Sequence, residues 1–487
     1  MMFRQANYDK KLLIEYPDTE NYKPYIEVDN ELKIELPENL KRTRPLNIPN
    51  LSEETVVRHF VRLSQMNYGV DTGIYPLGSC TMKYNPKLLE ELASLPEACN
   101  LHPAQHSSTV QGTLKIMYEM QQLLAKIAGM DAVTLQPAAG AHGELTGLLM
   151  IDAYFKDKGE SRTEVLIPET AHGTNPASSA MCGFDIVEIP MNAKGCIDLN
   201  SLKKAISSKT ACLMLTNPNT LGIFEEDVLE IATIVHDAGA LLYYDGANLN
   251  AILGYTNPGK MNFDVMHFNL HKTFGTPHGA GGPGAGPVAV KKILEPYLPV
   301  PTVGFDNEKY YFNYAHSKTI GKVRNFYANW SVILKAYIYI LLMGGDTLKS
   351  NTEQAVYNAN YLKDKLKDHF DFPYNDLRKH EFVVSAQKLK ENKGIRALDI
   401  AKRILDYGYH APTIYFPHLV PEAMMFEPTE TESEKDLEEF ANTIIKILSE
   451  DPETLKKAPT NTSVSRVDEL SAAKYPVLTW RMVNAGR

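Results

Sequence analysis

One lysine stands out in the sequence because of its neighbours. Lys272 follows the apolar run VMHFNL, lies between His271 and Thr273, and precedes the glycine-rich stretch GTPHGAGGPGAGP. Most isolated lysines are solvated surface charges, but a partly desolvated lysine beside other positive groups is activated as a nucleophile. Glycines let the backbone approach a ligand closely. This context favours a lysine that forms a Schiff base, with His271 beside it in the same site.

An acid is predicted at the end of a neighbouring strand. Asp245 ends the apolar run ALLYYD, and Ala247 follows two residues later. A carboxylate on an apolar strand end is costly unless it meets a positive partner. A protonated pyridinium nitrogen is such a partner in enzymes that use pyridoxal 5'-phosphate (PLP), and Ala247 is small enough for a flat ring to lie against it. The alternative is an aspartate that caps the next helix.

A third segment has the features of a phosphate-binding turn. In QPAAGAHGELTGLLMIDAYF an apolar strand ends in small residues, and a long helix is predicted to begin near His142. The backbone N–H groups of Gly140, Ala141 and His142 would point at an anion, helped by the helix dipole. Small residues also mark ordinary turns between strands and helices, so this signal is weak in isolation.

Two more loops carry polar residues toward the same predicted edge. His172, in PETAHGTNPASSA, would stack on a cofactor ring. The alternative is a loop histidine that is hydrogen-bonded to backbone. The turn TNPNTLG begins with Thr216, a candidate cofactor contact, and three of its residues are candidate donors to a ring hydroxyl: Asn217, Asn219 and Thr220. A polar turn of this kind is unremarkable alone.

Other kinds of site fit less well. His267 and His271 have the spacing of a helical metal pair, but four residues of strand separate them by roughly 13 Å, so no metal site is expected. Gly279–Gly284 has the spacing G-x-G-x-x-G, but it leads into a strand instead of opening a helix, so it is not a dinucleotide-binding loop. YPLGSCTMK places Cys80 beside no positioned base, so a structural loop is favoured over a nucleophile, although Cys80 could still face the site.

Short apolar runs alternate with helical segments through the middle of the chain. Strands of four to six residues that alternate with helices predict a mostly parallel sheet covered on both faces. In such a sheet ligands bind beyond the carboxyl ends of the strands, where the candidate residues fall. The seven predicted strands are 132–136, 164–168, 185–190, 211–216, 240–245, 265–270 and 287–290.

Changes in composition and in the pattern of predicted elements divide the chain into four parts. Residues 1–110 are predicted to form an extended arm with helices, and residues 111–330 a large PLP-binding α/β domain. Residues 331–450 are predicted to form a small α+β domain, and residues 451–487 an irregular tail. The predicted helices outside the tail are 53–65, 113–128, 143–155, 202–207, 227–238, 331–343, 352–369, 395–407 and 434–448.

Composition excludes several classes of protein. The 487 residues carry 50 Lys and Arg against 59 Asp and Glu, a net charge of −9, which argues against a nucleic-acid partner. No window approaches eighteen uninterrupted apolar residues, so no membrane span is expected. The N-terminus lacks the apolar core of a signal peptide. Five scattered cysteines without a C-x-x-C pair fit reduced thiols in a cytoplasmic protein.

Five motifs in this order resemble one family. They are YPLGSCTMK, QPAAGAHGE, AHGTNPAS, YYDGANLNA and NLHKTFGTPHGAGGPG, and the likeness continues through KHEFVVS, YGYHAPT and EPTETES. The chain resembles the glycine dehydrogenase (decarboxylating) of the glycine cleavage system, the P-protein family, and within it the separate second subunit of the two-chain form. The resemblance covers most of the chain, and its motifs are more specific than any single feature above.

The resemblance implies the PLP-dependent transferase fold of type I, with a seven-stranded sheet. It implies PLP bound as a Schiff base on Lys272, with Asp245 as the partner of the ring nitrogen and His172 stacked on the ring. Family members with Gln at the position of His142 imply that no imidazole role is needed there, and the backbone N–H of His142 keeps its role as a phosphate donor.

The same resemblance implies partners and a reaction. Glycine would lose CO2, and the remaining aminomethyl group would pass to the lipoyl arm of H-protein. A homologous sister subunit would complete the active site, with two copies of each chain. From the residues alone, other PLP enzymes stay open, such as an aminotransferase or an amino-acid decarboxylase, and so does a non-catalytic scaffold subunit.

Overall fold

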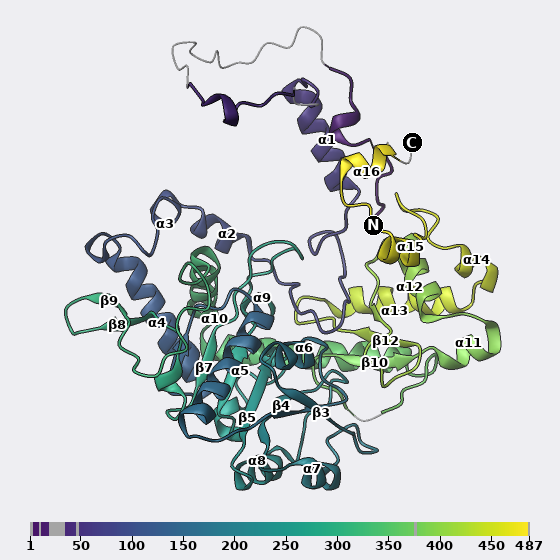
Figure 1. The fold of residues 1–487 in the computed structure, drawn as a ribbon. Coiled ribbons are helices and arrows are strands. Elements are labelled where there is room, and N and C mark those ends of the chain that lie inside the picture. The colour runs from purple at the N-terminus through teal and green to yellow at the C-terminus, as the bar shows by residue number, and fades with distance from the viewer. Residues whose placement is uncertain (1–2, 9–10, 19–34, 45–47, 375–376, 486–487) are drawn as a thin grey trace.

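A seven-stranded sheet forms the centre of the larger half of the protein (Figure 1). This computed structural model describes residues 3–8, 11–18, 35–44, 48–374 and 377–485. The strand order is β1-β7-β6-β5-β4-β2-β3; β7 runs antiparallel to both neighbours, and the other pairings are parallel. The predicted fold class is therefore confirmed. The strands are β1 Ala132–Thr134, β2 Glu164–Pro168, β3 Asp185–Ile189, β4 Thr210–Thr216, β5 Leu241–Gly246, β6 Val265–Phe268 and β7 Val288–Val290.

Helices cover both faces of this sheet. The central strands β4, β5 and β6 are buried along their whole length, as their unbroken apolar sequences require. Each predicted helix here is present, although α5 begins three residues earlier than expected, at Gly140. The helices of this half are α4 Gln111–Ala128, α5 Gly140–Asp157, α6 Thr174–Met181, α7 Leu199–Ala205, α8 Val228–Asp237 and α9 Leu270–Thr273.

A hairpin of two strands, β8 Thr302–Phe305 and β9 Tyr310–Asn313, projects from this half. The sequence pattern did not predict these two strands. Short 3-10 helices fill several connections. They are η1 Leu13–Glu15, η2 Glu38–Leu40, η3 Ser107–Thr109, η4 Leu249–Ala251, η5 Pro258–Met261 and η6 Glu295–Tyr297.

The smaller half is built on a three-stranded antiparallel sheet of order β10-β12-β11. Its hydrophobic core includes Phe382, Phe426 and Phe440, each fully buried. Ile74, from the N-terminal region, packs in the same core. The elements are β10 Phe382–Ser385, α11 Gln387–Lys393, α12 Ala397–Asp406, β11 Thr413–Ile414, β12 Ala423–Phe426 and α13 Glu434–Leu448.

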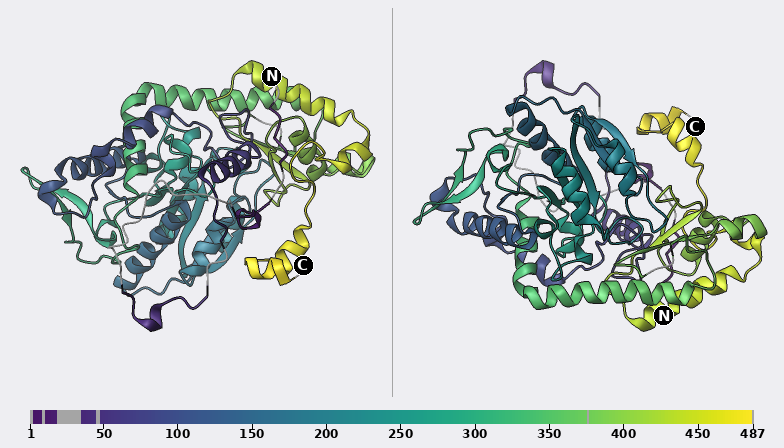
Figure 2. Two further views of the ribbon diagram at one scale, coloured as in Figure 1. Left: turned by 90° about the horizontal axis from the view of Figure 1, so that it is seen from above. Right: turned by 90° about the horizontal axis from the view of Figure 1, so that it is seen from below.

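The kinked helical segment α10 (Trp330–Leu366) joins the two halves along one side of the molecule (Figure 2). Two separate helices were predicted here, and the structure agrees, because Gly344 has non-helical angles of φ 61° and ψ −176° that divide the segment into two helices at a kink. By length and composition alone α10 could cross a membrane. Core helices meet the same criteria, and residues of α10 pack in both hydrophobic cores. The absence of a membrane span therefore stays a prediction.

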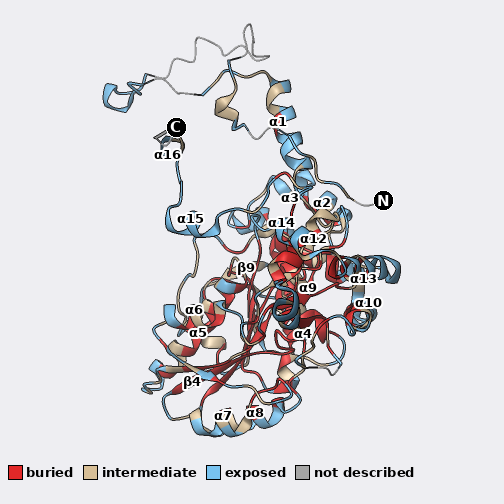
Figure 3. Ribbon diagram, turned by 90° about the vertical axis from the view of Figure 1, so that its right-hand side faces the viewer, coloured by how far each residue is buried: buried red, intermediate tan, exposed pale blue. Residues whose placement is uncertain are grey.

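The N-terminal region and the C-terminal tail meet away from the large sheet. Helix α1 (Glu53–Gln65) has the predicted bounds and the predicted Ser52 cap, and most of its surface is exposed (Figure 3). Part of the predicted arm, residues 19–34, lies outside the described residues. The tail was predicted to be irregular, which is wrong: short helices form where Asp451 and Asp468 accept hydrogen bonds as N-caps. The remaining helices are α2 Lys87–Ala93, α3 Pro96–Cys99, α14 Pro452–Lys457, α15 Glu469–Lys474 and α16 Trp480–Ala485.

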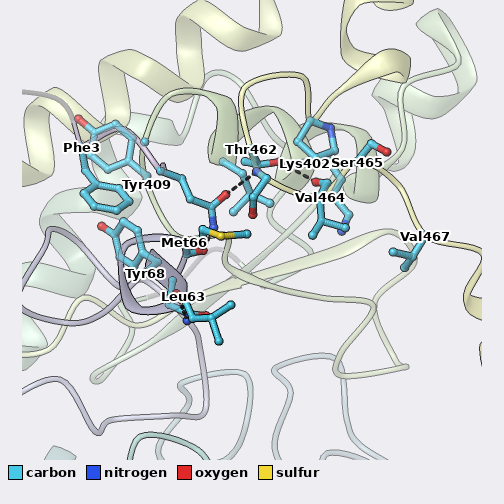
Figure 4. Close-up of a pocket in the computed structure, with 16 residues that line it drawn as sticks. Phe3, Leu63, Met66, Tyr68, Lys402, Tyr409, Thr462, Val464, Ser465 and Val467 are labelled. Atoms are coloured by element: carbon cyan, nitrogen blue, oxygen red, sulfur yellow. Dashed lines mark hydrogen bonds between the residues drawn. The ribbon is translucent and has the colours of Figure 1, made fainter. Parts of the chain in front are cut away.

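A pocket of about 440 Å³ opens where these terminal segments meet (Figure 4). Gln5 links its walls, since its side chain donates to the carbonyl of Met66 and accepts from the N–H of Ser463. Phe3, Tyr68 and Tyr409 line one side of it. None of the candidate site residues lines this pocket.

Candidate functional site

Strand register brings the candidate acid to one edge of the large sheet. Asp245 is the register partner of Thr216 on β4 and of His267 on β6. All three side chains are buried, with Asp245 2% exposed. Because β4, β5 and β6 are parallel, these residues meet where the strands end at their carboxyl edge, as the sequence predicts.

Asp245 is held ionised by its surroundings. Its carboxylate accepts hydrogen bonds from the N–H of Ala247 at 2.9 Å and the Nδ2 of Asn175 at 3.0 Å, and it lies 3.2 Å from the Nε2 of His267. Burial alone would raise the pKa of Asp245, but the charge and hydrogen bond of His267, with the other two bonds, hold that pKa well below its usual range. The alternative, in which Asp245 caps the next helix, does not hold. Asp245 accepts its backbone hydrogen bond from Ala247, whereas the next helix, η4, begins at Leu249 with Asn248 at its N-cap position.

Glu144 on α5 completes a buried cluster with Asp245 and His267. Their ligand atoms lie within 4.8 Å of one another, a separation that would suit a metal ion. The atoms are already engaged, however: Glu144 accepts from the hydroxyls of Thr174 at 2.8 Å and Ser178 at 3.1 Å. Burial and the nearby Asp245 raise the pKa of Glu144. For His267, burial lowers the pKa, but the charges of Asp245 and Glu144 outweigh it, so the net effect is a raised pKa. These shifts favour the protonated form of His267 beside the ionised Asp245.

Lys272 lies within one helical turn of the end of β6. Asn269 occupies the N-cap position of the short helix α9 without a side-chain capping bond, and the Lys272 Nζ donates a 2.9 Å hydrogen bond to the carbonyl of Ser79. His271 faces inward, 7% exposed, and burial, followed by the charge of Lys272, lowers its pKa to about 3. Because His271 is then neutral, it adds no charge beside the lysine at neutral pH.

Several buried polar atoms around this edge have no hydrogen-bond partner among the residues that the structure describes. The hydroxyl of Thr216 is one of them, next to Asp245 in register, and the Oδ1 of Asn175 is another. Others follow Lys272 along the chain: Thr273 Oγ1, Thr276 Oγ1 and His278 Nδ1. A buried polar group without a partner costs free energy, so these atoms, together with an ionised acid, fit a polar ligand with a cationic ring nitrogen.

The N-terminus of α5 lies against the lysine-bearing helix. Ala139 offers no side-chain cap, and the helical bonding begins with the N–H of Gly143, so three N–H groups before it lack an intrahelical acceptor: Gly140, Ala141 and His142. The His142 Nδ1 accepts from the N–H of Ala138 at 3.1 Å, so its imidazole closes the turn. These three N–H groups are available to an anion, so the predicted phosphate-binding role of this turn stays a prediction that the geometry allows.

Replacing Gly140 with alanine should destabilise the protein by about 2–3 kcal/mol, because the added Cβ would lie 1.9 Å from the Oδ1 of Asn269, at the N-cap position of α9. Gly112 is the matched control, since it lies in the first turn of the equally long α4 and its Cβ would meet nothing within 4 Å. Urea unfolding of both variants measures the difference. Equal stabilities would contradict the close packing of α5 on α9.

His172 lies at the start of α6, and solvent reaches it. Its Nδ1 is 2.9 Å from the Thr174 hydroxyl, and its ring meets the ring of Phe416 edge-on at 5.7 Å. Surrounding protein atoms, and then the positive charge of Lys272, lower the pKa of His172. The imidazole is therefore favoured in its neutral form, which suits stacking on a ring.

The turn after β4 serves the fold more than a ligand. The Nδ2 of Asn219 donates to Gly195 O at 2.8 Å, and Thr220 Oγ1 donates to Thr170 O. The Nδ2 of Asn217 lies 3.7 Å from Met261 Sδ, and its Oδ1 accepts from Glu225 N–H. As donors to a ring hydroxyl these three were open candidates, and all of them have protein partners. Thr216 keeps its hydroxyl free.

Comparison with known proteins places this geometry in a family. The model of the glycine dehydrogenase C-terminal domain matches residues 351–467, and that of aminotransferase class V matches residues 141–325. The "Probable glycine dehydrogenase (decarboxylating) subunit 2" of Thermoplasma acidophilum is 57% identical over 480 residues, covering 99% of this chain and 100% of that protein. The chain belongs to the glycine dehydrogenase (decarboxylating) subunit 2 family. A relative of the same name from Thermococcus onnurineus is 56% identical over 494 residues, covering 99% of this chain and 98% of that protein.

Solved structures of low identity share the fold of this family member. The crystal structure of a glycine decarboxylase (P-protein) of the glycine cleavage system, in inhibitor-bound form, has a TM-score of 0.71 at 21% identity, covering 85% of this chain and 93% of that chain. A NifS-like protein has a TM-score of 0.59 at 15% identity, covering 77% of this chain and 100% of that chain. The family resemblance expected from the motifs is confirmed.

Sequence reasoning missed several residues that this family member places in its site. His267 was weighed only as a metal ligand, but pairing the predicted strands in parallel register would have put it beside Asp245. Asn175 and Glu144 gave no local signal, because their roles depend on how α5 and α6 pack. Ser79 was seen only as part of a structural loop.

A second buried group of charges lies under that loop. His380, Glu381 and Glu427 are each 0% exposed, and the His380 Nε2 is 3.7 Å from Glu381 and 3.9 Å from Glu427. Burial, and then the charge of Glu427, raise the pKa of Glu381 to about 8. Burial lowers the pKa of His380 to about 4. Glu381 is therefore mostly protonated at neutral pH.

Replacing Glu381 with glutamine should remove a pH dependence of stability. The pKa of a glutamate with the ordinary value of 4.5 rises to about 8 here, so the folded state retains a proton that the unfolded state has lost. Stability from this group is present below pH 4.5 and is lost as the pH rises to about 8, on the order of 2–4 kcal/mol. Urea unfolding at both pH values should show this loss in the wild type and not in E381Q. Parallel losses would contradict the assignment.

Proposed function

We propose that this chain is the cofactor-bearing subunit of an enzyme that decarboxylates glycine and transfers the aminomethyl group to the lipoyl arm of H-protein. The observation that carries the proposal is the meeting of Lys272 and Asp245 at one sheet edge, in a chain 57% identical to a relative named for glycine dehydrogenase. Asp245 lies at the end of β5 and Lys272 just beyond the adjacent β6. An aminotransferase or another amino-acid decarboxylase would need the same pair, but the relatives' name favours glycine as the substrate.

The cofactor proposed is PLP, which when bound supplies an electron sink for the pair left on the substrate carbon. Lys272 Nζ is the group that would hold it covalently. Asp245 keeps its negative charge and so would keep a proton on the ring nitrogen. The remaining contacts proposed are with His172 and Ala247 on the ring, Thr216 and His271 beside it, and the N–H groups of Gly140, Ala141 and His142 at the phosphate.

The overall reaction balances with the lipoyl disulfide as oxidant. The bond between the glycine α-carbon and its carboxylate breaks and CO2 leaves. The α-carbon then bonds to one lipoyl sulfur while the other sulfur is reduced to a thiol. The exposed glycines at 279 and 281–282 follow Lys272 in the sequence. Residues this small would leave room for a lipoyl arm.

The proposed partners are a homologous sister subunit, with two copies of each chain, lipoylated H-protein and glycine. The words "subunit 2" in the names of the relatives support a sister chain. The compartment proposed is the cytoplasm, supported by five cysteines that are all free. A non-catalytic scaffold is the other candidate, and the engaged Lys272 beside an ionised Asp245 argues against it.

One assay tests the proposed reaction. The chain, co-expressed with its sister subunit, is given carboxyl-labelled glycine, PLP and lipoylated H-protein. We expect labelled CO2 that depends on the lipoyl group. Amino transfer to a 2-oxo acid without CO2 release would instead show an aminotransferase, and a pyridoxyl label confined to the sister chain after borohydride reduction would show a scaffold.

A further inference from the structure

The 77–83 loop (LGSCTMK) joins the small sheet to the site lysine. Leu77 forms a β-bridge with Phe426 on β12, and the Thr413 hydroxyl of β11 donates to the carbonyl of Gly78 at 2.9 Å. The next carbonyl, of Ser79, accepts the hydrogen bond from Lys272. The acceptor of the lysine amine is therefore positioned by the small sheet and not by the strands that carry the lysine.

Two buried carboxyl groups fix the shape of this loop. The N–H of Ser79 donates to Glu381 at 2.6 Å, and the N–H of Cys80 donates to Glu427 at 2.8 Å. Ser79 has φ 55°, in the left-handed region that side chains other than glycine rarely occupy. The cost of this conformation is offset by these bonds, because the ionised Glu427 is a strong acceptor for a backbone N–H group and the neutral Glu381 carboxyl still accepts one.

Lys83 and Thr81 hold Glu427 in place from the same loop. The Thr81 hydroxyl donates to the Glu427 Oε1 at 2.7 Å, and Lys83 lies 3.4 Å from the Oε2. Lys83 also donates to the carbonyls of Leu77 and Cys80, at 2.7 and 2.6 Å, which closes the loop on itself. Among the described residues, every hydrogen bond of the Glu427 carboxylate thus goes to the 77–83 loop.

One peptide unit connects Glu427 to the lysine. The Ser79–Cys80 peptide accepts from Lys272 Nζ through its C=O and donates to Glu427 through its N–H. A trans peptide is planar, so its C=O and N–H point in opposite directions and fixing one fixes the other. A carboxylate on the N–H also polarises the unit and strengthens the carbonyl as an acceptor.

We propose that Glu427 is a positioning residue for the Lys272 amine and acts through the Ser79–Cys80 peptide. The inference rests on the function proposed above, since it concerns the group that would capture the cofactor aldehyde. Glu381 bonds the preceding peptide, whose carbonyl belongs to Gly78 and is bonded to Thr413, so it shapes the loop without this direct connection.

The test is the rate at which Lys272 captures PLP in the full-length chain assembled with its sister subunit and freed of cofactor. Borohydride trapping with peptide mapping gives the rate on Lys272, and pyridoxine 5'-phosphate, which lacks the aldehyde, gives the affinity for ring and phosphate. We expect E427Q to slow trapping by about tenfold, the effect of losing one charge-assisted hydrogen bond, while the affinity for pyridoxine 5'-phosphate stays within about twofold. A purely structural role would weaken both.

Glu430→Gln is the matched control, because this residue lies three positions further on and is influenced by the charges of Glu427 and Lys83, but none of its described hydrogen bonds reaches the 77–83 loop. We expect E430Q to trap PLP at the wild-type rate. If E427Q does not fold, E427D takes its place. Aspartate keeps the negative charge but is one methylene shorter, so its carboxylate lies farther from the Cys80 N–H, and trapping should slow by about threefold. Trapping at the wild-type rate in E427Q or E427D, or parallel losses of trapping and analogue affinity, would overturn the inference. A wild-type chain that never traps PLP on Lys272 would contradict the proposed function instead.

Discussion

Replacing Lys272 with alanine should abolish lipoyl-dependent CO2 release from glycine, by at least about a thousandfold, and remove the pyridoxyl label from the chain. The physical reason is that the Nζ of Lys272 is the proposed covalent anchor, and alanine offers no amine at that position. The fold should survive, because the variant removes a single hydrogen bond to Ser79. Labelled CO2 and borohydride trapping measure the two effects.

Lys291 is the matched control for this variant. Like Lys272 it is half-buried and its Nζ makes one 2.9 Å hydrogen bond to a backbone carbonyl, that of Gly129. Lys291 lies just after β7, at the far side of the sheet from the strand-end site, so K291A should retain the pyridoxyl label and full activity. A label that persists in K272A would show that another amine holds the cofactor.

The sequence was sufficient to predict the sheet because most of its strands are buried on both faces, and only the edge strand β3 is largely exposed. Each of the seven runs is apolar and bounded by turn residues, so strand positions followed from composition and length alone. The hairpin β8–β9 was missed because its stability comes from outside it: Gln121 on α4 bonds both the N–H and the C=O of Val303. Gln111 does the same for Tyr310. A long-range bond of this kind leaves no local pattern.

The same contrast holds for the site: some of its residues follow from the local sequence, and others depend on long-range contacts. Lys272, Asp245 and the turn at Gly140 each end or follow a strand, so the rule for parallel sheets could place them. The residues that tune them lie elsewhere in the chain: Asn175 bonds Asp245 from α6, and Ser79 bonds Lys272 across 193 positions. Glu381 and Glu427 reach the site only because the small sheet packs against the large one. Such contacts depend on how the two halves dock, which periodicity cannot reveal.

Replacing Asp245 with asparagine should lower kcat for glycine decarboxylation on the order of a thousandfold with little change in the shape of the site. The structure holds the pKa of Asp245 well below its usual range, through His267, Asn175 and the N–H of Ala247, so the group is a full negative charge at neutral pH. A neutral amide can accept one hydrogen bond but cannot keep a proton on the cofactor ring nitrogen. Steady-state kinetics with glycine and lipoylated H-protein give the ratio.

Asp264 offers a control of similar burial at the opposite edge of the sheet. It precedes β6, is 8% exposed, and its carboxylate bonds the His236 Nε2 and the Leu242 N–H, both at 2.8 Å. D264N should therefore lower thermal stability and leave kcat near the wild-type value, whereas D245N should lower kcat while Lys272 still traps the cofactor. If both variants lost activity in proportion to their stability, Asp245 would be a structural acid. Its position beside a free Thr216 hydroxyl argues for the catalytic outcome, because that edge of the sheet retains polar atoms that the protein itself leaves without partners.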